Sequence, residues 1–232
     1  ILAGADFLKV IASGAVFSIG TDPGAPEMTR ADIEAVVAVA KAYGKKVTAH
    51  VHSDQSGRDA ILAGVDSLEH ASLLEDSTID LALKRGVAFS MDVYNGTYTD
   101  TIGRQQGYPE IFLQRNTYTT EAQRIVFEKA YKKGVTLLYG TDAAVLPHDM
   151  GAWQFAIMVE RGMAPMDAIR SATSVAAAHM GLADEVGAIL PGNAADLIAI
   201  QGNPLEDITA LRRVDLVMKD GIVIKSHESI EH

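Results

Sequence analysis

Four apolar segments of this chain each follow a glycine and each end at or near a side chain that can bind a metal ion. These side chains are Lys9, His50, His70 and Asp142. A glycine just past a helix end permits the left-handed turn that closes the helix, so each unit is predicted to run from helix to strand. Because the carboxyl ends of parallel strands converge on one face, we expect the four side chains to gather there. This pattern indicates a metal-dependent hydrolase.

Composition restricts the partners and the metal ligands. The chain has 232 residues, of which 48% are hydrophobic and 22% charged, as in a globular protein with a large core. Its net charge of −10 disfavours nucleic acid and anionic membrane surfaces as partners. The partner that we expect is a small-molecule substrate. The absence of cysteine excludes disulfides and thiolate ligands, so nitrogen and oxygen must hold any metal.

No apolar run approaches the roughly 20 residues that span a bilayer, and we expect a cytoplasmic protein. Self-association into a homo-oligomer stays open. The chain begins at Ile1, within a segment that resembles a helix-to-strand connection, so an N-terminal targeting signal would not be visible. We expect that the natural sequence starts further upstream.

Strands alternate with helices in the first 180 residues, which predicts βαβ units around a parallel sheet. The expected strands are 6–11, 46–50, 67–70, 87–91 and 135–139, and the expected helices are 30–43, 58–63, 77–85, 121–133, 151–160 and 165–179. Thr29 and Ser77 are the expected N-caps of two helices. From residue 181 onward, strands and turns predict a small β unit, with a hairpin at Asp220-Gly221. The predicted domains are therefore 1–180 and 181–232.

Residues 92–118 are polar and rich in glycine, tyrosine, asparagine and threonine, which predicts a long loop. A loop of this length in a compact domain usually has a function. Tyr94 and Tyr98 are its candidate substrate contacts.

Each candidate ligand also has a structural interpretation. Lys9 lies in an apolar strand, where a lysine commonly extends its amine to solvent. Burial could instead lower its pKa enough for carbon dioxide to modify it. His50 and His52 are two positions apart, which places both on one face of a strand, and His70 ends the next strand. Strand-end histidines are often hydrogen-bonded structural residues, although two strands that end alike favour a site.

The tripeptide Gly-Thr-Asp occurs twice, at residues 20–22 and 140–142. The second copy directly follows an apolar strand, so Asp142 is assigned to the site. Asp22 lies in a segment rich in proline and glycine and is expected to be a turn residue.

The segments Phe-Leu-Lys-Val, Thr-Ala-His, Leu-Glu-His-Ala and Tyr-Gly-Thr-Asp, in this order, resemble the ends of barrel strands four, five, six and eight of the amidohydrolase superfamily. Residues 187–197 resemble the segment that enters the small β-sandwich of that superfamily. Within it, Lys9 and the pair Glu69-His70 resemble the imidazolonepropionase-like and Xaa-Pro dipeptidase-like branch. The resemblance implies a TIM-type (β/α) barrel with an appended β-sandwich.

The resemblance also implies roles for the residues. Lys9 would be carboxylated and bridge two zinc ions, His50 and His70 would bind one ion, and Asp142 would bind the other and accept a proton from water. His52 would donate a hydrogen bond to the substrate. The implied reaction is hydrolysis of a dipeptide or an N-acyl amino acid, with a cyclic amidase or a deaminase as the alternative enzyme.

The chain departs from this family pattern in one respect. The first barrel strand of the family carries a His-x-His pair for the second metal, and no such strand precedes Lys9. Five barrel strands can be counted, so we expect the C-terminal part of a longer enzyme. The alternative is a non-catalytic fragment with a partial metal site.

Overall fold

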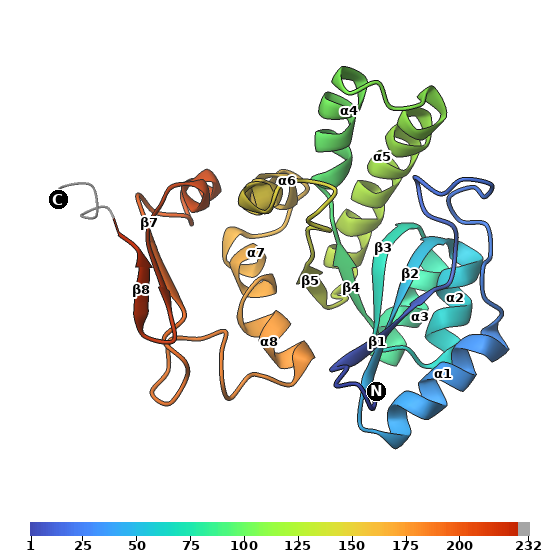
Figure 1. The fold of residues 1–232 in the computed structure, drawn as a ribbon, viewed down its shortest axis with the longest axis horizontal. Coiled ribbons are helices and arrows are strands. Elements are labelled where there is room, and N and C mark those ends of the chain that lie inside the picture. The colour runs from blue at the N-terminus through green and yellow to red at the C-terminus, as the bar shows by residue number, and fades with distance from the viewer. Residues whose placement is uncertain (227–232) are drawn as a thin grey trace. The chain divides into compact units, whose positions relative to one another are not determined.

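A computed structural model describes residues 1–226 and separates into two compact units, Ile1–Leu146 and Pro147–His232. The first unit is an α/β unit around a five-stranded sheet, and the strands lie side by side in chain order (Figure 1). All neighbouring pairs are parallel, as the alternation of strands and helices predicted. The strands are β1 (Phe7–Ile11), β2 (Lys46–Ser53), β3 (Ser67–Leu73), β4 (Ala88–Met91) and β5 (Leu137–Tyr139).

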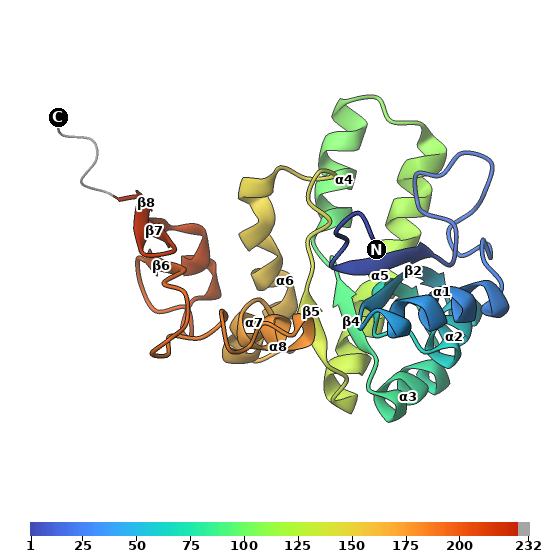
Figure 2. The same cartoon turned by 60° about the horizontal axis from the view of Figure 1, so that its bottom comes forward.

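Four helices of the first unit lie along one face of this sheet. They are α1 (Arg30–Ala42), α2 (Asp54–Ala63), α3 (Asp76–Arg85) and α5 (Glu110–Lys133). Figure 2 shows the row that the first three of them, α1 to α3, form. The predicted Thr29 cap of α1 is confirmed, because its side chain accepts from Asp32 N while Asp32 accepts from Thr29 N. Left-handed glycines close the other three helices, at Gly64, Gly86 and Gly134. These closures turn the chain back into the next strand.

The core of the first unit lies between the sheet and these helices. Its strand residues alternate toward the helices, and its helix residues form apolar faces. The fully or nearly fully buried members are Val47, Ala49, Val51, Leu68, Phe89, Ile33, Val37, Ile61, Ile79, Ala82 and Phe127. The opposite face of β1 is open, since Phe7 and Ile11 are 54% and 44% exposed. The sheet is therefore packed on the face that the helices cover.

Two expectations for the first unit were wrong. Residues 92–118 are not a long loop, because they contain α4 (Asn95–Gln105) and the start of α5, which pack against each other as a helical hairpin. The apolar periodicity that marks a helix is missing from α4, whose buried residues are Asn95, Gly96, Thr99 and Gly103. Ser77 is not the cap of α3, which begins one residue earlier, after Glu75.

The second unit begins with helices and ends in an antiparallel sheet of three strands. The expected single helix 165–179 is interrupted after Ser171 into two shorter helices. Its elements are η1 (His148–Trp153), α6 (Gln154–Glu160), α7 (Pro165–Ser171), α8 (Ser174–Met180), β6 (Leu197–Ile200), η2 (Ile208–Arg212), β7 (Val214–Lys219) and β8 (Ile222–Lys225). The compact units thus divide at residue 146, whereas the expected domain boundary at 180 falls inside the second unit.

The predicted hairpin at Asp220-Gly221 is confirmed. These two residues connect β7 to β8, and both have positive φ, 50° and 77°. That conformation matches the right-handed twist of the strands that the turn joins. No helix among residues 1–226 is long and apolar enough to cross a membrane.

Candidate metal centre

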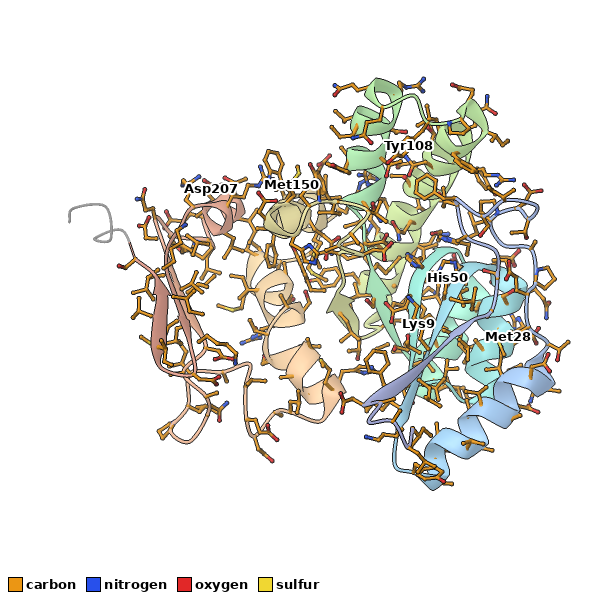
Figure 3. All side chains as sticks on the ribbon, viewed as in Figure 1. Lys9, Met28, His50, Tyr108, Met150 and Asp207 are labelled. Carbon is orange, nitrogen blue, oxygen red and sulfur yellow. The ribbon has the colours of Figure 1, made fainter. Side chains whose placement is uncertain are left out.

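Three histidines gather on the neighbouring strands β2 and β3. His50 and His52 lie on one face of β2 because side chains two positions apart in a strand point the same way. Their ring centroids are 4.7 Å apart, and the ring of His70 on β3 is 4.5 Å from His50 and 5.0 Å from His52. The neighbouring strands that carry Lys9 and His50 are visible in Figure 3. The structure therefore brings together the three histidines that the sequence singled out.

The chemistry of this cluster fits a metal ion. Each of the three histidines offers a ring nitrogen within 4.8 Å of those of the other two, and His50 and His52 are only 7% and 4% exposed. His50 Nε2 is buried and has no hydrogen-bond partner within the described chain. An unpaired buried nitrogen is unfavourable by about 1–3 kcal/mol unless something binds it. Imidazole is a common ligand of zinc and other transition metals.

His70 reaches the cluster through an unusual backbone. In the register of the sheet, His50 faces Glu69 and Val51 faces His70, so a regular β3 would point His70 toward the helices. Instead, His70 and Ala71 have positive φ values, 66° and 51°. This local left-handed conformation re-aims the His70 ring toward His50. For residues other than glycine such a conformation is unfavourable by roughly 1–2 kcal/mol, so it requires support from its surroundings.

Asp92, which follows β4 directly, supplies part of that support and was not foreseen as a site residue. Its carboxylate lies 2.9 Å from His70 Nδ1 and accepts from Asn95 Nδ2 at 3.0 Å and from Gln123 Nε2 at 2.6 Å. Burial by itself would raise the pKa of Asp92, but the charge of His70 and these hydrogen bonds outweigh it and lower the pKa. Asp92 is therefore an ionised partner that leaves His70 Nε2 available.

The three imidazoles respond differently to this environment. Burial, followed by the nearby charges of His70 and Lys9, lowers the pKa of His50 to about 3. Burial, followed by the neighbouring His70 and His50, places the pKa of His52 well below its usual value. Burial also acts to lower the pKa of His70, but the Asp92 charge and hydrogen bond reverse this and raise it. His50 and His52 are thus neutral near pH 7, as metal ligation requires.

Lys9 and Asp142 lie on the solvent side of the cluster. Lys9 is exposed in the described chain, so the burial considered as the cause of its reactivity is not observed. Asp142, also exposed, has a φ of 50° and accepts a hydrogen bond of 3.3 Å from Asn95 Nδ2. Lys9, His70 and Asp142 line one small cavity of about 40 Å³. Asp22, from the other Gly-Thr-Asp, instead pairs with Arg115 outside the site.

The glycine of the second Gly-Thr-Asp has a local reason. A Cβ atom at Gly140 would overlap Ser90 Oγ of the adjacent strand β4. The end of β5 can therefore approach β4 closely only without a side chain at this position. That approach carries the chain to Asp142 beside the cluster.

A larger cavity of about 170 Å³ lies above the histidines. Tyr94 and Tyr98, which were the expected substrate contacts, are not among the residues that line it. The part of its wall away from the candidate ligands is neutral and comes from the 15–17 segment, α4, α5 and Val145: Ala15, Val16, Phe17, Gly96, Thr99, Asn116, Thr119, Thr120 and Val145. Sequence reasoning missed Gly96, Thr99 and Asn116 because it assigned residues 92–118 to a loop.

The chain belongs to the amidohydrolase family, whose model matches residues 1–224, and the predicted superfamily is thereby confirmed. It is 32% identical to the ochratoxinase of Aspergillus niger over 239 aligned positions, which cover 96% of this chain and 47% of that protein. A crystal structure of a Xaa-Pro dipeptidase with methionine in its active site superposes with a TM-score of 0.91 at 37% identity, over 96% of this chain and 55% of the other.

A prolidase crystallised with N-methylphosphonate-L-proline gives a TM-score of 0.89 at 28% identity, over 97% of this chain and 56% of the other. The chain therefore spans about half the length of the proteins that it resembles. Similarity of this extent establishes the family and the fold of the matched half.

Proposed function

We propose that this protein is a metal-dependent hydrolase that cleaves the amide bond of a dipeptide or an N-acyl amino acid. The observation that carries the proposal is the buried histidine cluster, with an unpaired His50 Nε2, beside Asp142 in a cavity. The sheet of five consecutive parallel strands is consistent with one side of a (β/α) barrel, and the antiparallel sheet with part of a β-sandwich. We therefore propose that the complete protein has a (β/α) barrel with an appended small β-sandwich.

The ligands in this proposal are His50 and His70 for one zinc ion and Asp142 for a second. Lys9 lines both cavities, and its amine makes no hydrogen bond within residues 1–226. Reaction of that amine with carbon dioxide would give a carbamate, whose two oxygens could join the two sites. Divalent ions held here would supply Lewis acidity, which makes water a better nucleophile and the amide carbonyl a better electrophile.

The residues of the chain have distinct tasks in the hydrolysis. Asp142 accepts the proton that the attacking water loses, and passes it to the departing amine, because an exposed carboxylate at the cavity can reach both. The Nδ1 atom of His52 lies 3.0 Å from Ser72 Oγ. A neutral His52 that accepts from Ser72 carries its proton on Nε2, from where it donates to the substrate oxygen.

The cavity supports a substrate with an uncharged, partly apolar group. Val16, Phe17 and Val145 provide apolar surface, and Thr99 and Thr120 provide hydroxyl groups. The names of the relatives agree with this chemistry, since a Xaa-Pro dipeptidase, a prolidase and an ochratoxinase are among them. A dipeptide with an apolar residue is accordingly the first substrate to test.

Metal analysis and kinetics test the proposal together. The purified protein should contain a divalent ion, lose its activity when a chelator removes that ion, and regain it with zinc. A panel of dipeptides, N-acyl amino acids, lactams and aminated heterocycles should give amine release from the first two classes. A protein without bound metal, or full activity in Lys9→Ala, would refute the mechanism. Turnover restricted to lactams or heterocycles would refute the substrate class.

A further inference from the structure

One side chain of α5 contacts both the backbone and the ring partner of His70. Gln123 Nε2 donates to the His70 carbonyl at 3.2 Å and to Asp92 Oδ1 at 2.6 Å. The Asp92 atom that it contacts is also the one that lies 2.9 Å from His70 Nδ1. Gln123 is 5% exposed and Asp92 is 8% exposed, so neither contact competes with bulk water. The Gln123 amide thus restrains the backbone of His70 directly and its ring through Asp92.

His70 requires such restraint because its backbone is left-handed. Without the positive φ of 66°, the ring would point toward the helices and away from His50. The peptide after His70 must also remain fixed, since Ala71 is left-handed as well. A return of the backbone to regular β conformation would have to reorient that peptide. Gln123 opposes this change because it donates to the carbonyl of the peptide.

A second amide connects the same network to Asp142. Asn95 Nδ2 donates to Asp92 Oδ2 at 3.0 Å and to Asp142 Oδ2 at 3.3 Å. Asp142 also has a positive φ, 50°, so both candidate ligands in unusual backbone conformations touch one network. Asn95 comes from α4 and Gln123 from α5, which places both donors on the helical hairpin.

We propose that Gln123 and Asn95 are positioning residues that act through Asp92 to hold His70 and Asp142 in the arrangement a metal ion needs. The inference rests on the proposed function, because it takes His70 and Asp142 to be ligands. Hydrogen-bond partners of this kind fix the tautomer and orientation of ligating groups, and their loss typically weakens metal binding roughly 10-fold to 100-fold.

Zinc titration of the metal-free protein tests the proposal without reference to turnover. Gln123→Met keeps the length of the side chain and removes both N–H donors. We expect its dissociation constant for Zn²⁺, measured by isothermal titration calorimetry, to rise roughly 10-fold to 100-fold. The visible absorption spectrum of the Co²⁺-loaded variant should also differ from that of the wild type, because the ligand arrangement changes.

Asn116→Leu is the matched control. Asn116 lies two helical turns before Gln123 on α5, is also buried, and donates to Gly96 O and to Asp100 Oδ1, both at 2.9 Å. This substitution removes the same chemical group and loosens the same hairpin, but it leaves the contacts to His70 and Asp92 in place. We expect a lower free energy of unfolding with an unchanged Co²⁺ spectrum.

The outcomes separate the two claims. A wild-type protein that binds no Zn²⁺ refutes the proposed function and this inference with it. A wild-type protein that binds Zn²⁺, together with a Gln123→Met variant of equal affinity and identical Co²⁺ spectrum, refutes the inference alone. Equal changes in Gln123→Met and Asn116→Leu would also refute it, because general loosening would then explain both. If circular dichroism shows that Gln123→Met is unfolded, the same titration of Asn95→Leu decides.

Discussion

Strands β1 and β3 each carry a candidate ligand, and they present it in opposite ways. Lys9 lies in a regular strand, is exposed, and its side-chain amine makes no hydrogen bond within residues 1–226. His70 has a strained backbone, an 11% exposed side chain, and hydrogen bonds at both its ring and its carbonyl. The comparison teaches that a ligand is oriented by the elements around its strand. Position at a strand end brings a ligand near the site, but does not by itself aim it.

The largest effect is expected at a third candidate ligand, Asp142, which shares features of both. It is exposed like Lys9 and has a positive φ like His70. In the proposed mechanism, Asp142→Asn removes the proton acceptor, so kcat for amide hydrolysis should fall by roughly 10²-fold to 10⁴-fold. The measurement is steady-state kinetics on the preferred dipeptide. A variant that keeps its kcat would show that Asp142 does not transfer the proton.

Unfolding of the metal-free protein tests the contrast between β1 and β3 directly. His70→Ala leaves the buried Asp92 carboxylate without its ion-pair partner, and should lower the free energy of unfolding by about 3 kcal/mol or more. Lys9→Ala changes an exposed side chain and should stay within about 0.5 kcal/mol. Urea titrations measure both. Equal losses in the two variants would remove the distinction between a fixed and a free ligand.

The approach of β5 to β4 extends the comparison to another strand end. Gly140→Ala introduces a methyl group that overlaps Ser90 Oγ, so the free energy of unfolding should fall by about 1–3 kcal/mol. Removing that oxygen in the double variant with Ser90→Ala should recover most of the loss, because the next nearest atom is 3.6 Å away. Thermal unfolding of the single and double variants measures this. An undiminished loss in the double variant would place the strain elsewhere.

The pH dependence of stability is the most gradual of these effects, because it is spread over several pH units. In the metal-free protein, burial lowers the pKa of His50 from 6.5 to about 3. Between these pH values the unfolded chain binds a proton at His50 that the folded chain does not, so His50 makes stability fall as the pH is lowered. The raised pKa of His70 acts in the opposite direction, adding stability at low pH that is lost as the pH rises.

We therefore expect His50→Gln to flatten the acid side of the stability profile. Urea unfolding at a series of pH values between about 3 and 6.5 makes the comparison with the wild type. Identical slopes in the two proteins would mean that His50 is protonated in the folded state as readily as in the unfolded one.

The strands and the positions of most candidate ligands could be predicted from the sequence because each rests on local patterns. Glycines such as Gly64 and Gly86 end a helix and start a strand within a few residues. The spacing of His50 and His52 fixes their common face for the same reason. The helix α4 could not be found this way, because its buried face consists of small and polar residues that contact α5.

The inner support of the site also lies beyond local patterns. His70 points toward His50 because of a left-handed backbone conformation, and no glycine at that position marks it in the sequence. Gln123, which contacts His70, is 53 residues away in the chain. Asp92 follows a strand, like the predicted ligands, and that position was a signal that could have been used. Its role depends on Asn95 and Gln123, whose convergence only the folded chain reveals.

Helix α5 both lines the cavity and contacts residues of the candidate metal site. Asn116 ties it to α4, and two turns later Gln123 reaches His70 and Asp92, with Thr119 and Thr120 on the cavity wall between them. If the proposed metal site is correct, a library that diversifies this stretch for new substrates would disturb metal loading as well. Randomising Val16 and Val145 instead changes the cavity wall outside that helix.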